Sequence, residues 1–218
     1  MKDHLRAHLF LPMIASMEID PDILRSSKTH KRLMNKAVHY LGRYQASQQR
    51  LRRVLRQFAK RKFDPEKTVT ERTPEEIEKA IEEVIALCVG YGYVDDKALA
   101  AAKARSSVIT GQSAYQLAGK LRLMGVDEET TNHALSNRKA DHHDAEKAAA
   151  IRAMRKKRLG PYCASYDRLE FAEKQKQVAK LARLGFSLDL VRTILSYASP
   201  DEAEEALYRA DAAPDNHI

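Results

Sequence analysis

Residues 121–126 read LRLMGV, and residues 181–186 read LARLGF. In each stretch leucines precede a glycine and an apolar residue follows it. This order is typical of the end of a helix, because glycine adopts the left-handed conformation that stops a helix without strain. The apolar residue after the glycine can then fold back onto the finished helix. Asp127 and Ser187 follow as N-caps, so each stretch predicts a corner between two helices.

The rest of the chain has the same helical period, and the predicted fold class is all-α. No stretch alternates apolar and polar residues for long, as a half-buried strand would. Glycines 92, 125, 160 and 185 follow apolar segments at the places where a left-handed residue is needed. Residues 88–93, CVGYGY, resemble a weaker third copy of the corner. A repeated helical module is therefore expected.

The corners divide the chain into three modules of three helices. Repeat 1 covers residues 31–92, repeat 2 covers 93–139 and repeat 3 covers 140–199, with an N-terminal flank (1–30) and a C-terminal tail (200–218) of uncertain order. Helices are expected to end near Leu41 and to begin near Ser47, Thr73, Asp95, Ser113, Asp127, Asp141, Asp167 and Ser187. Units of this size bury little core alone, so an elongated array of stacked repeats is expected.

Composition describes a globular protein without a disulfide framework. The chain has 218 residues, of which 44% are hydrophobic, and two cysteines, Cys88 and Cys163. Two isolated cysteines are too few for a disulfide framework or a Cys-x-x-Cys metal site. The first residues lack the apolar run of a secretion signal. We expect a cytoplasmic protein without a cofactor.

Positive charge is concentrated in the first third of the chain. The net charge is +8, and thirteen lysines or arginines lie between Arg25 and Lys62 without a single acidic residue. A solvated helix face usually carries both signs, so this run indicates a surface that binds a polyanion, either nucleic acid or an acidic protein.

The helix opened by Ser47 illustrates how such a surface is built. Leu51, Leu55 and Phe58 recur at helical spacing and are expected to face the core, whereas Arg52, Arg56 and Lys60 form a stripe at intervals of four. The full set of predicted contact residues is Arg43, Arg50, Arg52, Arg53, Arg56, Lys60, Lys62, Arg105, Lys120, Arg122, Arg155, Lys156, Lys157, Arg158, Lys174, Lys176, Lys180 and Arg183.

Catalytic motifs are absent from the sequence, and no catalytic, cofactor or metal residues are predicted. The adjacent carboxylates Asp95 and Asp96 stand at a helix start, where capping explains them. No P-loop, Gly-x-Ser-x-Gly elbow or HExxH motif occurs. Tyr91 and Tyr93 could stack on a nucleic-acid base, but the favoured interpretation is that both close the corner at Gly92 and point into the core.

Several segments together resemble the RecX family, the regulators of the RecA recombinase. The resemblance covers residues 34–198 and is most specific at Gly92-Tyr93-Val94-Asp95-Asp96, although Leu99 stands where the family has an aromatic residue and Arg50 where it has an acidic one. The family usually has Arg and Lys just before Gly111, where this chain has Val108, Ile109 and Thr110. The positions that match the family as structural residues are Ser47, Leu51, Gly92, Tyr93, Asp95, Asp96, Gly111, Leu121, Gly125, Gly185 and Phe186.

A monomer is expected, because a repeat array caps its own ends and no leucine-zipper pattern occurs. The resemblance implies a non-enzymatic protein of three tandem three-helix repeats. Such a protein lies in the deep groove of the RecA filament on single-stranded DNA and damps RecA's ATPase, strand-exchange and coprotease activities. Weaker direct binding to DNA is expected beside this contact, from the basic residues. The alternative left open by the residues is a helix-turn-helix regulator that binds duplex DNA directly. A helical adaptor for another acidic partner is a third interpretation.

Overall fold

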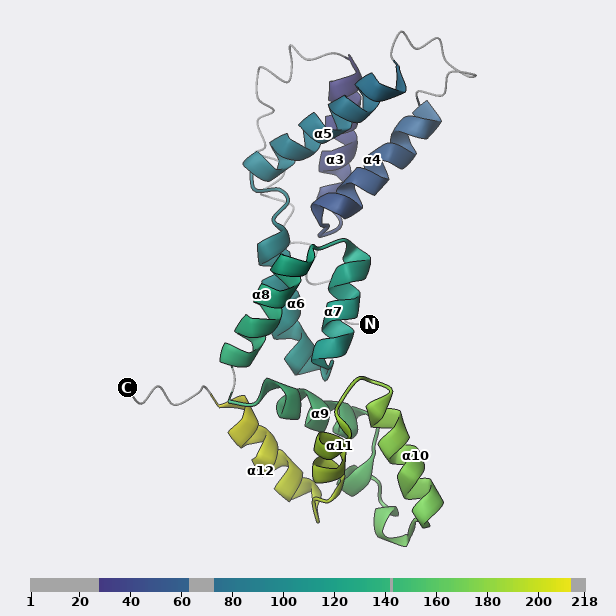
Figure 1. Ribbon diagram of the computed structural model, residues 1–218, viewed down its shortest axis with the longest axis vertical. Coiled ribbons are helices and arrows are strands. Elements are labelled where there is room, and N and C mark those ends of the chain that lie inside the picture. The colour runs from purple at the N-terminus through teal and green to yellow at the C-terminus, as the bar shows by residue number, and fades with distance from the viewer. Residues whose placement is uncertain (1–27, 63–72, 142, 213–218) are drawn as a thin grey trace, which may run out of the picture. The chain divides into compact units, whose positions relative to one another are not determined.

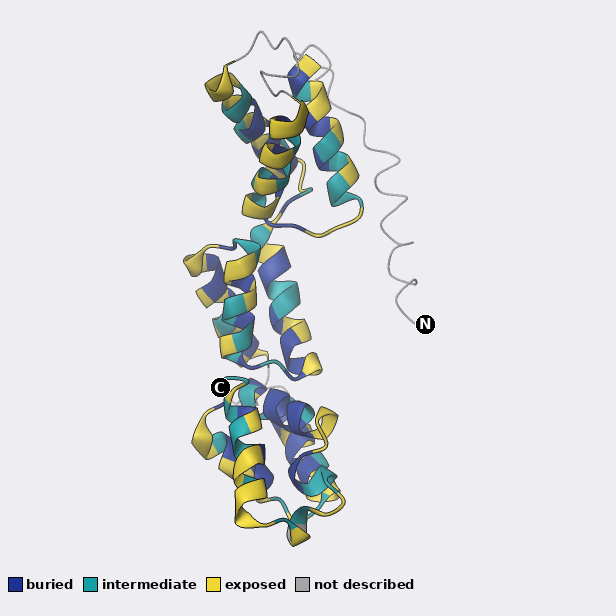
Figure 2. Cartoon of the chain, turned by 90° about the vertical axis from the view of Figure 1, so that its right-hand side faces the viewer, coloured by how far each residue is buried: buried dark blue, intermediate teal, exposed yellow. Residues whose placement is uncertain are grey.

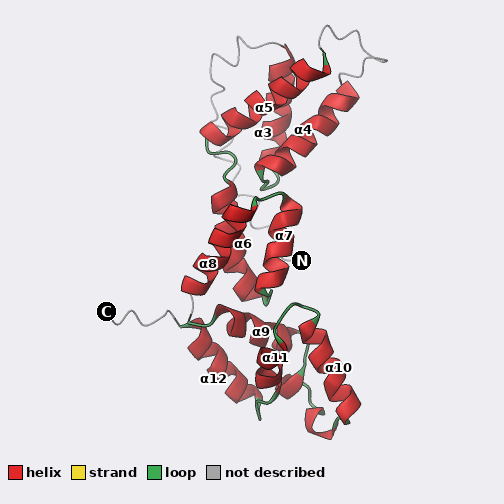
Figure 3. Ribbon diagram, in the orientation of Figure 1, coloured by secondary structure: helices red, strands yellow, loops and turns green. Residues whose placement is uncertain are grey.

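The computed structural model describes residues 28–62, 73–141 and 143–212. These residues form ten α-helices and two short 3₁₀ turns, and no strand occurs among them (Figure 3). The all-α prediction is therefore confirmed. In the described part of the chain, no helix combines the length and the apolar character needed to cross a membrane.

The chain forms two compact units, residues 1–99 and 100–218, and the boundary falls within helix α6 (Asp96–Thr110). In the first unit, α3 (Lys28–Leu41), α4 (Gln48–Lys62) and α5 (Pro74–Gly90) pack against one another in pairs (Figure 1). Each helix turns one face inward, and Leu33, Leu55 and Ile81 are almost fully buried there. This amphipathic pattern is visible as alternating buried and exposed positions in Figure 2.

The predicted start of α5 is confirmed in detail. The Thr73 hydroxyl accepts a hydrogen bond from Glu76 N, and the Glu76 carboxylate accepts one from Thr73 N, so the capping box is complete. Pro74 occupies the first helical position, where its missing N–H costs nothing. The basic helix α4 begins as predicted, since Arg50 N donates to Ser47 Oγ.

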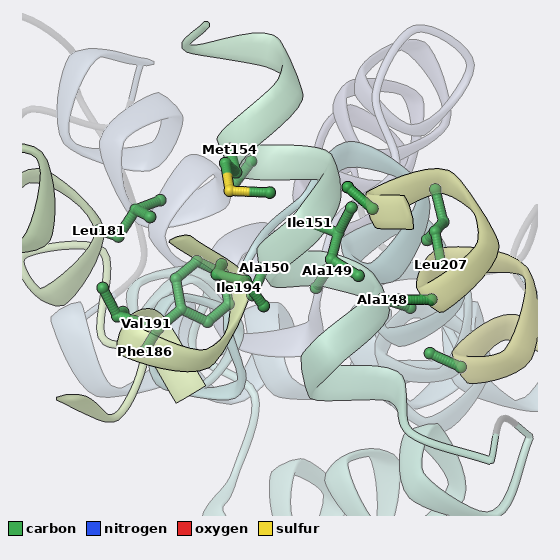
Figure 4. Close-up of a cluster of buried hydrophobic side chains, with 14 of the residues drawn as sticks. Ala148, Ala149, Ala150, Ile151, Met154, Leu181, Phe186, Val191, Ile194 and Leu207 are labelled. Atoms are coloured by element: carbon green, nitrogen blue, oxygen red, sulfur yellow. The ribbon is translucent and has the colours of Figure 1, made fainter. Parts of the chain in front are cut away.

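The second unit is organised around α9 (Ala145–Lys156). Helices α10 (Phe171–Ala182), α11 (Leu188–Leu195) and α12 (Pro200–Asp211) pack against it. Figure 4 shows the side chains of α9 between Phe186, in the corner before α11, and Leu207 of α12. The alanines of α9 are small enough for these helices to approach closely. Helices α7 (Ala114–Met124) and α8 (Glu128–Ala140) pack against each other, and α8 also contacts α9.

Both glycine corners have the predicted geometry. Gly125 (φ 80°) and Gly185 (φ 88°) are left-handed. After Gly125, Val126 N donates to Leu121 O at 3.0 Å, and Val126 is buried, which is the Schellman contact expected from LRLMGV. Phe186, which follows Gly185, is likewise buried. Asp127 and Ser187 then cap α8 and α11 through their side chains.

Three boundaries in the C-terminal third differ from the prediction. Helix α9 starts at Ala145 because Asp144, rather than Asp141, caps it. Helix α10 starts at Phe171 rather than near Asp167, since two 3₁₀ turns (Gly160–Tyr162 and Tyr166–Arg168) occupy the preceding chain. Residues 200–211, which the prediction left in the tail, form α12.

Helix α12 has start signals of its own in the sequence, although it was not among the predicted helices. Ser199 caps it and Pro200 takes its first position, as Thr73 and Pro74 do in α5. Ala203, Leu207 and Ala210 are buried against the second core. Residues 1–27 of the predicted N-terminal flank lie outside the described residues, and residues 28–30 belong to α3. The division into three repeats stays a prediction.

Candidate interaction surface

The predicted arginine stripe on α4 is engaged in ion pairs with α5. Arg52 binds Glu82 with two parallel hydrogen bonds, Nε to Oε1 at 2.5 Å and Nη2 to Oε2 at 2.7 Å. Arg56 Nε donates to Glu78 Oε1 at 2.8 Å one turn further along. The hydrogen bond between Arg52 and Glu82 raises the pKa of Arg52 and lowers that of Glu82. These two arginines therefore hold α4 against α5.

The outer face of α4, which we define as Arg50, Arg53, Gln57 and Lys60, lies away from the core. All four side chains are exposed. Arg53 and Lys60 have no ion-pair partner among the described residues. Neither α3 nor α4 contains a carboxylate. This face keeps its positive charge, and Lys62 is exposed at the end of the same helix.

The predicted cations of the second unit divide in the same way. Arg155 is paired with Glu204 at 3.0 Å, Lys176 is paired with Glu173 at 2.5 Å, and Lys174 lies 5.2 Å from the ring centre of Tyr166. The remaining predicted residues of this unit are exposed: Arg105, Lys120, Arg122, Lys156, Lys157, Arg158, Lys180 and Arg183. In the first unit Arg43 is also exposed.

Lys176 and Lys180 on α10 and Arg183 at its C-cap share one exposed face, separate from the buried Gln177 and Leu181. A second cationic helix face is thus present in the second unit. Because Glu173 partly neutralises Lys176, the positive charge of this face comes mainly from Lys180 and Arg183.

The two adjacent carboxylates of the GYVDD segment have separate structural roles. Asp95 Oδ1 accepts a hydrogen bond from Ala98 N at 2.9 Å and so caps α6. Asp96 Oδ1 instead accepts one from Gln48 N at 3.0 Å, which ties the start of α4 to the start of α6. The capping interpretation is confirmed for Asp95, and Asp96 adds a link between helices that the sequence did not reveal.

A buried arginine that is not among the predicted residues joins three helices of the second unit. Arg138 on α8 is 2% exposed. Its Nε donates to Ser107 Oγ on α6 at 3.0 Å, and its Nη1 donates to Glu146 on α9 at 2.5 Å. Glu146 also accepts from Ala114 N at the start of α7. The signal was available, because Arg138 lies four residues after the buried Ala134 on the same helix face.

Among the described residues, no group of three histidine, cysteine, aspartate or glutamate side chains could hold a metal ion. Both cysteines are free thiols. Burial raises the pKa of Cys88 to about 11, which keeps this thiol protonated at neutral pH. A hydrogen bond from the backbone of Ser165 lowers the pKa of Cys163. The chemical features that the described surface does offer are its cationic helix faces.

Comparison with known proteins gives one consistent family. No protein-family model matches the chain. Regulatory protein RecX from Myxococcus xanthus is 34% identical over 163 residues, 75% of this chain and 83% of that protein. Regulatory protein RecX from Agrobacterium fabrum is 28% identical over 196 residues, 88% and 97% of the two chains.

A solved structure agrees with these relatives at the level of the fold. The crystal structure of RecX from Lactobacillus salivarius aligns with a TM-score of 0.56 at 17% identity, and the alignment covers 83% of this chain and 97% of that one. The all-helical architecture is therefore shared with RecX. On the identity and coverage of the Myxococcus xanthus relative, this chain belongs to the RecX family of regulatory proteins.

Proposed function

We propose that this chain binds in the groove of the RecA–DNA filament and inhibits or modulates RecA's ATPase, strand-exchange and coprotease activities in recombination, DNA repair and the SOS response. It acts by binding, as a cytoplasmic monomer without chemistry of its own. Membership in the RecX family carries the proposal. The positively charged helix faces support it, because a nucleoprotein filament is a polyanion.

The ion-pair pattern on α4 refines which residues make the contact. Arg52 and Arg56 already bind carboxylates within the molecule, so their charge is largely neutralised before any partner arrives. Arg53 and Lys60 on the outer face are the better contact residues. The contacts of the other predicted cations remain part of the proposal.

The test is RecA's ATP hydrolysis on single-stranded DNA with this protein added below one equivalent. We expect suppression by the wild type and weaker suppression by the double variant Arg53→Gln, Lys60→Gln. The control variant Lys79→Gln, Lys97→Gln removes the same charge from exposed positions in the same unit and is expected to suppress as the wild type does. Unchanged hydrolysis at equimolar wild type would refute the proposal and favour direct binding to duplex DNA.

A further inference from the structure

Four of the nine tyrosines lie in two pairs at one place in the first unit. The ring centres of Tyr40 and Tyr44 are 5.2 Å apart, and those of Tyr91 and Tyr93 are 5.5 Å apart. Tyr44 from one pair and Tyr93 from the other line a cavity of about 220 Å³. Leu41, Ala46 and Leu99 complete its apolar wall, together with Gln45, Gly92, Asp95 and Ala98. The cavity lies between the loop before α4 and the corner after α5.

Only part of this aromatic group serves the core. Tyr93 is half-buried and packs against the first hydrophobic core, as the sequence analysis expected of a corner residue. The same expectation is wrong for Tyr91, which is 40% exposed, and Tyr44 is 57% exposed. A large ring that stays this accessible at the rim of a cavity contributes little to folding, because most of its apolar area remains in water. Tyr44 thus presents a ring face to which a ligand can bind.

The surroundings of the cavity are positively charged. Arg43 is exposed and precedes Tyr44 directly in the chain. Arg50 on α4 donates through Nε to the Tyr40 hydroxyl at 3.1 Å, so its guanidinium lies beside the first tyrosine pair. Neither arginine has an ion-pair partner among the described residues. One carboxylate is present in the lining, Asp95, which accepts a hydrogen bond from Ala98 N as the cap of α6.

Aromatic rings beside arginines are the combination that binds single-stranded nucleic acid: bases stack on the rings, and guanidinium groups hold the phosphates. We propose that this cavity receives one base of single-stranded DNA, stacked on Tyr44, while Arg43 and Arg50 contact the flanking phosphates. At about 220 Å³ the cavity is smaller than the pockets that hold drug-sized ligands, and it suits a single flat ring. The arginines favour a base over an apolar protein side chain, which would not need them. The inference concerns naked DNA and does not depend on RecA.

The absence of tryptophan from the chain gives a clean test. Tyr44→Trp would contain the only indole, at a half-exposed position that tolerates the larger ring. Its fluorescence is measured while an oligonucleotide of deoxythymidines is added, and again with an abasic strand of equal length and charge. We expect quenching by the strand with bases and little quenching by the abasic strand. Tyr208→Trp is the matched control, at a tyrosine of the second unit that is 79% exposed. Its fluorescence is expected to be quenched by neither strand.

Affinity measured by fluorescence anisotropy completes the test. Tyr44→Ala is expected to weaken binding of the deoxythymidine strand by roughly 5- to 100-fold, and Tyr44→Phe is expected to retain most of the affinity. Circular dichroism of each variant establishes that the fold is intact. Equal binding of the two strands by the wild type, or no binding of either, would overturn the proposal. Loss of binding to DNA-free RecA in Tyr44→Ala, with DNA affinity unchanged, would assign the cavity to a protein side chain instead.

Discussion

At the scale of single residues, the glycine at position 185 does more than end a helix. Its φ of 88° lies in the left-handed region, and a Cβ there would stand 2.7 Å from Tyr115 Cβ and 2.9 Å from Ser113 Oγ. The Ser113 hydroxyl in turn donates to Leu184 O. The start of α7 therefore packs closely against the corner at residues 181–186. Only glycine at position 185 leaves room for this contact.

A pair of glycine substitutions tests this interpretation. Gly185→Ala is expected to lower the free energy of unfolding by about 1–3 kcal/mol, because the added methyl group meets both backbone strain and Tyr115. Gly119→Ala is the control, since Gly119 lies inside α7 with open space around it. Alanine there is expected to raise the free energy of unfolding by about 0.5–1 kcal/mol. Urea unfolding measures both values. Equal effects of the two substitutions would show that the close approach at residue 185 has no energetic weight.

At the scale of elements, α4 and α5 are joined by a ladder of two ion pairs, Arg52–Glu82 and Arg56–Glu78. The sequence could predict the stripe on α4 from its spacing, but not its partners, because the register between two antiparallel helices is set by core packing. A sequence pattern shows which face a charge occupies only relative to its own helix. The same limit explains why Asp96 was predicted as a local acid and not as the group that binds Gln48 N.

A double-mutant cycle of Arg52→Gln and Glu82→Gln measures the strength of one rung. Both side chains are partly exposed, so we expect a coupling energy of about 0.2–1 kcal/mol at neutral pH. The pKa of Glu82 is lowered in the folded state, so this stabilisation is present above the ordinary pKa of a glutamate and is lost as the pH falls through the lower, folded-state value. The exposed pair Arg209–Glu205 serves as a control with smaller coupling. Coupling that persists in strong acid would contradict the assignment.

At the scale of the whole molecule, helix type and most helix starts followed from the sequence, because caps and glycine stops are local signals. The boundaries near residues 141 and 167 did not, since several capping residues compete there and 3₁₀ turns leave no periodic trace. The cationic character of α4 was predictable from the sequence. Which of its cations form ion pairs, namely Arg52 and Arg56, could be seen only in the packed structure. The sequence indicated Tyr91 and Tyr93 as possible stacking residues. It did not indicate that Tyr44, far away in the sequence, lines the same cavity as Tyr93.

The two compact units have separate hydrophobic cores, which predicts separable unfolding. Leu51 is fully buried in the first core and Ile194 in the second. Truncating either side chain to alanine is expected to cost about 2–5 kcal/mol, since each leaves a cavity among packed neighbours. Because the cores do not share these residues, each substitution is expected to destabilise its own unit and leave the other nearly unchanged.

Native-state hydrogen exchange followed by mass spectrometry distinguishes the units directly. Leu51→Ala is expected to speed exchange in peptides from α3, α4 and α5, and Ile194→Ala in peptides from α9, α11 and α12. The conservative variants Leu51→Met and Ile194→Val control for substitution itself and are expected to have smaller effects at the same places. If either alanine variant accelerated exchange equally throughout the chain, the two cores would unfold as one cooperative body. The two units would then not be independently stable, because the loss of one core would unfold the other core and the contact surfaces on both.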